Sequence, residues 1–208
     1  LALRLSSPEE VERDWPHDEA ERISELRFPD GGPALWVDSA DGHGHLAYAS
    51  GFGTARILPT HDRVLIAPAD EPDWVWQRFL AGQLLPLVAV LQGLEVFHAS
   101  VVVSDGGAIA IVAPSGAGKT TLALHLVLAG LGWASDDVLT VEPDGDGLLV
   151  HPGLGLANIR AGGEELLARL EERDLASPIG SNERETRASI RRRPEPAALR
   201  ALFFLIRH

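Results

Sequence analysis

The residues with the clearest chemistry stand at positions 113–121, which read Ala-Pro-Ser-Gly-Ala-Gly-Lys-Thr-Thr. An apolar run at 108–112 precedes them and another at 122–129 follows, so we expect a strand, a loop and a helix. Gly116 and Gly118 lack a Cβ, which lets the backbone curl with its N–H groups pointing inward, towards an anion at the positive end of the helix. This pattern is typical of a polyphosphate-binding loop. The residues expected to bind the polyphosphate of a nucleotide are Pro114, Ser115, Gly116, Ala117, Gly118, Lys119, Thr120 and Thr121.

Lys119 and Thr120 are the side chains of this loop expected to contact the phosphates and the metal ion. A lysine at this position reaches the terminal phosphates, and the hydroxyl that follows it is placed to ligate Mg²⁺. Of the 18 basic residues in the chain, 17 are Arg and one, Lys119, is Lys. A compact ammonium enters a ring of backbone amides that a planar guanidinium is too broad to enter. The single lysine therefore favours a nucleotide site over the alternative, a glycine-rich turn without a ligand.

Two adjacent carboxylates, Asp136 and Asp137, follow the predicted loop helix. Gly130 is placed to end that helix in the left-handed conformation, and residues 133–141 are predicted to return as a strand. Neighbouring strand residues face opposite sides, so one Asp is expected to face the nucleotide while the other takes a different partner. A Mg-nucleotide site needs acidic groups near the end of a neighbouring strand, which favours this interpretation over an exposed acidic pair.

Composition limits the classes of partner. The formal net charge of −12 argues against nucleic acid and anionic membranes as partners. Gln92 and Glu95 interrupt the longest apolar run before it reaches the roughly 18 residues that span a bilayer, and the N-terminus lacks a signal segment. We therefore expect a cytoplasmic protein whose partners are small molecules and proteins, with homo-oligomerisation left open. The absence of Cys excludes thiol chemistry, and the absence of Met leads us to expect a longer gene product.

The first 72 residues are predicted to be a β-rich region. Residues 1–27 are interpreted as peripheral, while short apolar runs between breakers at 34–67 predict a small antiparallel sheet. His43, His45 and His61 lie on different turns, with Asp41 or Asp62 as a further candidate ligand. Because a metal needs three or four convergent ligands, we interpret them as surface histidines.

Residues 73–208 are expected to form the domain that positions the loop. Apolar residues at three- and four-residue steps predict an amphipathic helix at 73–91, with Pro86 kinking or ending it. Residues 96–103 and 108–113 are predicted to form a hairpin whose second strand leads into the loop. The later elements expected, in order, are a hairpin turn at 142–147 rather than a calcium loop, a charged helix at 164–172, a polar segment at 176–196 and a buried strand at 201–206. The polar segment carries five arginines and is interpreted as disordered or as a lid over phosphates.

Taken together, these motifs resemble the HPr kinase/phosphorylase family of serine kinases. The similar residues are His98-Ala-Ser, the loop 113–121, Ser135-Asp136-Asp137 and the stretch 152–159, Pro-Gly-Leu-Gly-Leu-Ala-Asn-Ile. The resemblance covers about residues 80–160. It implies an α/β fold, a P-loop nucleotide-binding domain akin to that of phosphoenolpyruvate carboxykinase, that uses ATP and Mg²⁺ to phosphorylate a serine hydroxyl of a peptide or protein.

The resemblance also implies roles for individual residues. Asp136 is expected to act as general base and Asp137 to face Mg²⁺ with Thr120, while His98 orients and tunes Asp136 and Lys119 holds the terminal phosphates. The chain departs from the family at Val150 and Pro152, where the family has Glu and Arg. One acidic magnesium partner is therefore absent, and a ribosomal peptide is an alternative acceptor to HPr.

Two function classes follow. The first is a Mg-ATP-dependent kinase acting on a hydroxyl, and the second is a regulatory or assembly module that binds ATP without phosphoryl transfer. His98 and Asp136 discriminate between them, because a binding module needs no base. Carboxykinase chemistry is disfavoured because those enzymes use further lysines.

Overall fold

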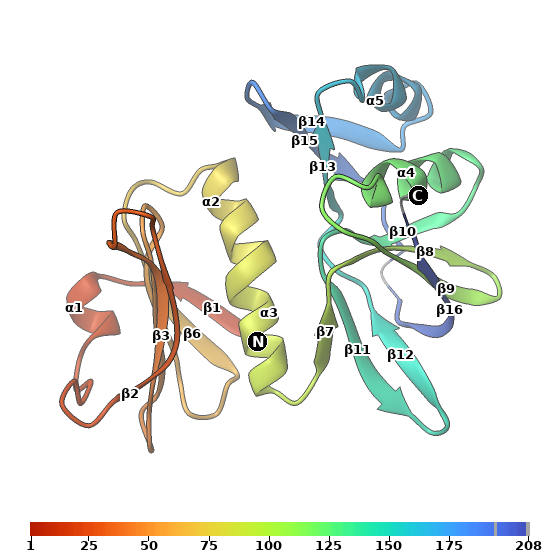
Figure 1. Ribbon diagram of the computed structural model, residues 1–208. Helices are drawn as coiled ribbons and strands as arrows, with labels where there is room; N and C mark the ends of the chain where they lie inside the picture. The colour runs from red at the N-terminus through yellow and green to blue at the C-terminus, as the bar shows by residue number, and fades with distance from the viewer. Residues whose placement is uncertain (194, 207–208) are drawn as a thin grey trace. The chain divides into compact units, whose positions relative to one another are not determined.

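The structure is a computed structural model that describes residues 1–193 and 195–206. It is a mixed α/β protein with several sheets in which strands predominate (Figure 1). The chain divides into two compact units, Leu1–Leu80 and Ala81–His208, whereas the sequence-based boundary lies between residues 72 and 73.

The first unit is built on a six-stranded sheet with the order β1-β6-β5-β4-β3-β2. Its elements are β1 (Ala2–Leu5), α1 (Pro8–Val11), β2 (Glu21–Arg27), β3 (Pro33–Ala40), β4 (Gly44–Ala49), β5 (Gly53–Ile57), β6 (Arg63–Pro68) and α2 (Trp74–Phe79). The antiparallel strands expected at 34–67 are confirmed as β3 to β6. β1 and β2 were not expected; every residue in both strands is exposed, so neither has a buried apolar face.

Apolar side chains from α1 and the sheet form the core of this unit. Val11 and Trp15 pack with Ala40, Leu46 and Ala67 in one buried cluster. Alternation along the strands sends every second residue to this face, which is why Gly44 and Leu46 of β4 are buried while His45 between them is only half-buried.

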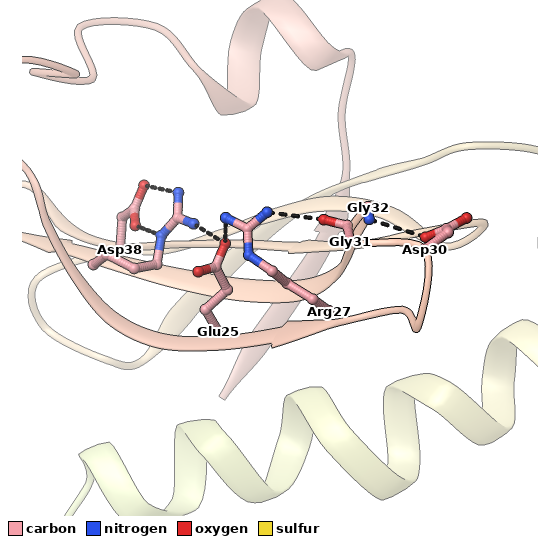
Figure 2. A network of polar contacts seen from close by, with 7 residues as sticks. Glu25, Arg27, Asp30, Gly31, Gly32 and Asp38 are labelled. Atoms are coloured by element: carbon pink, nitrogen blue, oxygen red, sulfur yellow. Dashed lines mark hydrogen bonds and ion pairs between the residues drawn. The ribbon is translucent and has the colours of Figure 1, made fainter.

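Charged groups cover the exposed edge strand β2. Arg22 donates to Asp38 of β3 and pairs with Glu25 at 3.3 Å, and Arg27 pairs with the same Glu25 at 2.6 Å. Figure 2 shows this network continuing from Arg27 into the turn 28–32, where its guanidinium donates to the Gly31 carbonyl. Exposed charges on an edge strand discourage pairing with a further strand.

The helix expected at residues 73–91 is confirmed as α2, the π-helical stretch η1 (Leu80–Leu84) and α3 (Leu85–Leu91). Asp73 caps it, accepting a hydrogen bond from the Trp76 N–H, and Pro86 lies in the first turn of α3 just after the π-turn. In the described residues, Trp74–Leu91 is one helix of sufficient length and hydropathy to cross a membrane, a test that core helices also pass. The expectation that no segment has these properties was therefore wrong.

The second unit contains a seven-stranded sheet with the order β10-β8-β9-β16-β12-β11-β7. Its strands are β7 (Glu95–Phe97), β8 (Ala99–Ser104), β9 (Gly107–Val112), β10 (Gly132–Ser135), β11 (Leu139–Asp144), β12 (Gly147–His151) and β16 (Ala197–Phe204). The hairpins expected around residues 104–107 and 142–147 are confirmed as β8–β9 and β11–β12. Helix α4 (Lys119–Leu128) buries Ala123, Leu124 and Val127 against Ile111 of β9 and Trp133 of β10. This packing fixes the start of α4 at the end of β9.

A three-stranded sheet, β13-β15-β14, completes the unit together with helix α5 (Glu164–Glu171), which confirms the charged helix expected at 164–172. Its strands are β13 (Leu156–Arg160), β14 (Ala176–Ser181) and β15 (Glu185–Ile190). The interpretation of 176–196 as disordered was wrong for residues 176–190, because β14 and β15 pair there as a hairpin. Residue 194 lies outside the described residues. Pro178 is accommodated because β14 is an edge strand with a register shift at that point.

The strand expected at 201–206 is present as part of β16, but it is not buried. β16 pairs in parallel with β9 over Leu199 to Phe204 and with β12 only at Ala197 and Ala198. Leu202, Phe203 and Phe204 are exposed, because hydrogen bonding within a sheet does not itself cover the faces of a strand.

Candidate functional site

The predicted nucleotide loop lies between β9 and α4, as expected from the sequence. We call residues 113–118 the glycine loop. Gly116 and Gly118 both take left-handed backbone angles, with φ of 78° and 97°, and Gly118 is the N-cap of α4. The Ala117 N–H donates to the Pro114 carbonyl at 3.1 Å, which tightens the loop, and Thr121 is exposed in the first turn of the helix. The structure thus brings together all eight residues expected to bind the nucleotide.

Lys119 is a buried cation among neutral acceptors. Its side chain is 6% exposed, and its Nζ donates to the Ala113 carbonyl at 2.9 Å and contacts His98 Nε2 at 3.0 Å. Because His98 Nδ1 lies 2.9 Å from the Asp137 carbonyl, which only accepts, we assign the proton to Nδ1 and leave Nε2 to accept from Lys119. A buried ammonium with neutral partners favours an anion beside it.

His98 therefore contacts different groups from those expected. It lies between β7 and β8, and it contacts Lys119 and the Asp137 backbone rather than the Asp136 carboxylate. The Asp136 carboxylate is instead held by Ser100, two residues further along in β8, whose side chain is fully buried. Alternation along the strand, which places residues two apart on one face, was the signal that could have identified Ser100.

Asp136 lies against the residue expected to ligate magnesium. The Thr120 hydroxyl donates to the Asp136 carboxylate, with oxygen–oxygen distances of 2.9 and 3.0 Å. Burial first, and the charge of Asp137 second, raise the pKa of Asp136 from 3.8 to about 6, against the lowering effect of the hydrogen bonds from Ser100 and Thr120. A carboxyl group with a pKa in this range is suited to exchange protons near neutral pH.

The acidic pair stands in a turn and not within a continuous strand. β10 ends at Ser135 and β11 begins at Leu139, and Asp137 has a left-handed φ of 62°. The expected strand over residues 133–141 was therefore wrong, because the Asp136 carbonyl accepts from the Val138 N–H at 2.8 Å and closes a turn there. The separation of the two carboxylates comes from this turn rather than from strand alternation.

A second chain of polar groups holds Asp137. Asn158 of β13 donates its Nδ2–H to Asp137 Oδ2 at 3.1 Å, and Arg187 of β15 donates to Asn158 Oδ1 at 3.0 Å. Arg187 is 2% exposed and stands directly across the strand pair from Asn158. The arginines expected to act together as a lid are thus divided, since Arg193 pairs instead with Asp105 at 3.3 Å.

The glycines of the stretch 152–159 lie in close contact with neighbouring strands. A Cβ on Gly153 would lie 2.3 Å from Ser135 Oγ, and one on Gly155 would lie 2.8 Å from the Ile190 carbonyl, so neither position accepts a side chain without movement. Val150, which stands where the HPr kinase family has Glu, is a buried core residue of β12. Its position supplies no metal ligand.

Within the described residues, no group of three or more His, Asp or Glu side chains converges as a metal site. The interpretation of the histidines of the first unit as surface residues on turns was wrong for His45, which lies within β4 and is half-buried. Its ring centroid is 5.5 Å from that of His61, and burial lowers the pKa of His45. A nucleotide-bound Mg²⁺ needs fewer protein ligands, since phosphates and water complete its shell. Thr120 with the neighbouring carboxylates fits that requirement.

No protein-family model matches this chain, and no curated protein matches it. A solved structure, the Hpr(Ser) kinase/phosphatase from Coxiella burnetii, is similar at 25% identity over 30% of this chain and 39% of that chain, with a TM-score of 0.27. The match spans well under half of that structure, and a likeness of this extent carries no argument about fold or function. We therefore rest the function on the geometry of the site.

Proposed function

We propose that this chain is a Mg-ATP-dependent kinase with a P-loop fold, which transfers the γ-phosphate to a serine hydroxyl of a peptide or protein. The observation that carries the proposal is the contact between Thr120 and Asp136 at the start of α4, directly beside the buried Lys119. A glycine loop, a buried ammonium, a hydroxyl and a carboxylate in this order are the parts that phosphoryl transfer requires.

In this proposal the glycine loop and Lys119 hold the phosphates. Thr120 and Asp137 would hold Mg²⁺, which would supply positive charge that offsets the negative charge of the phosphates during transfer. Asp136 takes the proton of the acceptor hydroxyl as its oxygen bonds to the γ-phosphorus and the bond from phosphorus to the β-bridging oxygen breaks, which releases ADP. His98 holds the Lys119 ammonium and, through the Asp137 carbonyl, the turn that carries both carboxylates.

The serine acceptor rests on the motifs shared with HPr kinases, and the departures at Val150 and Pro152 favour a different protein or peptide substrate from HPr. A ribosomal peptide is the alternative acceptor. A module that binds ATP without transfer is the second candidate function, and it would leave the raised pKa of Asp136 without use.

The test is phosphate transfer from γ-labelled ATP into a cell extract, followed by phosphoamino acid analysis. Wild type should label a discrete peptide or protein on serine. Asp136→Asn should lower transfer by roughly 10²- to 10⁴-fold, the usual contribution of a general base, while ATP affinity stays within a few-fold. Asp146→Asn, in the exposed β11–β12 turn, is the matched control. ATP binding without labelled product in any extract fraction would favour the binding module.

A further inference from the structure

Strand β13 directs two polar side chains towards the glycine loop and the acidic pair. Asn158 and Arg160 are two residues apart and share one face, while Ala157 and Ile159 of the opposite face are buried in the core. Asn158 contacts Asp137, and Arg160 Nη2 donates to Ser115 Oγ in the glycine loop at 3.1 Å. One strand face therefore contacts both the loop and the carboxylate turn.

The Arg160 guanidinium lies directly on the loop. A Cβ placed on Gly116 would be 3.1 Å from Arg160 Nη1, so the guanidinium occupies the space above the left-handed Gly116. Arg160 itself is exposed, and its present acceptor in the loop is a neutral hydroxyl. A guanidinium gains more from a phosphate, which accepts two parallel charge-assisted hydrogen bonds.

We propose that Arg160 contacts the terminal phosphate of ATP and makes the site prefer ATP to ADP. This inference rests on the proposed function. The position follows from the contacts of β13: Arg160 lies on the glycine loop at Ser115, and Asn158 on the same strand face contacts Asp137. The neighbouring carboxylate, Asp136, contacts Thr120, so the same strand face borders the side of the loop where the terminal phosphates would lie. Lys119 and Arg160 would then hold the terminal phosphate from two directions.

The test is calorimetric titration with a non-hydrolysable ATP analogue and with ADP, both with Mg²⁺. Arg160→Gln should weaken the ATP analogue about tenfold or more and change ADP affinity less than threefold, because only the γ-phosphate contact is lost. Arg160→Lys should recover part of the preference, since it keeps the charge but not the bidentate geometry. Arg169→Gln, an exposed arginine on α5, should leave both affinities unchanged.

The outcomes separate this inference from the proposed function. If wild type binds neither nucleotide, the nucleotide site itself is wrong and both proposals fall. If wild type binds both nucleotides but Arg160→Gln weakens them equally, or weakens neither, the ATP-binding site stands and the role of Arg160 is refuted.

Discussion

The Asp136→Asn variant should be more stable than wild type at neutral pH in the absence of metal. Burial and Asp137 raise the pKa of Asp136 from 3.8 to about 6, so the folded chain binds this proton more tightly than the unfolded chain does. Wild-type stability should therefore fall as pH rises from about 4 to about 6, where the buried carboxyl ionises. At about 1.4 kcal/mol per pKa unit, ionisation of Asp136 lowers the free energy of unfolding by roughly 3 kcal/mol. This figure is an upper limit, since part of the residue remains accessible to water.

Amide hydrogen exchange with a chelator present measures this difference in stability for the second compact unit, which contains Asp136. Peptides covering β8 and β9 report its opening, and the intrinsic exchange rate largely cancels when wild type and variant are compared at one pH. Protection should be equal near pH 4 and should become greater in Asp136→Asn by about tenfold or more above pH 6.5. Asp146→Asn should match wild type throughout. A variant less protected than wild type at neutral pH, or a difference that does not change with pH, would refute the assignment of a destabilising buried charge to Asp136.

Asp137→Asn should raise the Mg²⁺ concentration needed for half-maximal ATP binding by about tenfold or more. Asn158→Ala should raise it to a smaller extent, because Asn158 only orients the Asp137 carboxylate. Titration of Mg²⁺ at fixed ATP measures both effects, and unchanged curves would remove Asp137 from the metal site. Gly53→Ala should destabilise the first unit by about 2 kcal/mol or more, because a Cβ there would lie 2.1 Å from the Ala67 carbonyl at a φ of 105°, whereas Gly51→Ala, with open space around it, should cost about 1 kcal/mol. Urea denaturation followed by tryptophan fluorescence separates the two glycine variants, and equal costs would contradict the close approach of β5 to the Ala67 carbonyl.

Local patterns were enough to predict the parts of the site that follow one another in the chain. The hairpin β8–β9, the glycine loop and α4 appear where apolar periodicity and glycine spacing placed them. The long helix and the hairpin β11–β12 were predicted for the same reason, since their signals are confined to neighbouring residues.

Contacts between distant segments were not accessible in this way. Ser100 and Asn158 reach the acidic pair only because β8 and β13 lie beside that turn in the folded unit. The polar segment 176–190 forms the hairpin β14–β15, and β15 also pairs with β13, a strand that precedes helix α5 in the sequence. The high arginine content of this segment gave no indication that one of its arginines, Arg187, is buried and donates a hydrogen bond to Asn158.

The exposed strands β1 and β2 were missed because their side chains give no sign of the pairing. Their pairing comes from backbone hydrogen bonds to β6 and β3, while their side chains show no buried face. Where a strand lies at the edge of a sheet, alternation is a weak signal and tertiary pairing decides the structure.

The most direct test of the central claim, that the glycine loop and Lys119 form a Mg-ATP site, is calorimetric titration of ATP into wild type and Lys119→Ala. Wild type should bind ATP in the presence of Mg²⁺, and Lys119→Ala should lose an order of magnitude or more in affinity, because charge-assisted contacts to phosphate are worth roughly 1.5–3 kcal/mol each. Equal affinities of wild type and Lys119→Ala, with both proteins folded, would contradict the claim.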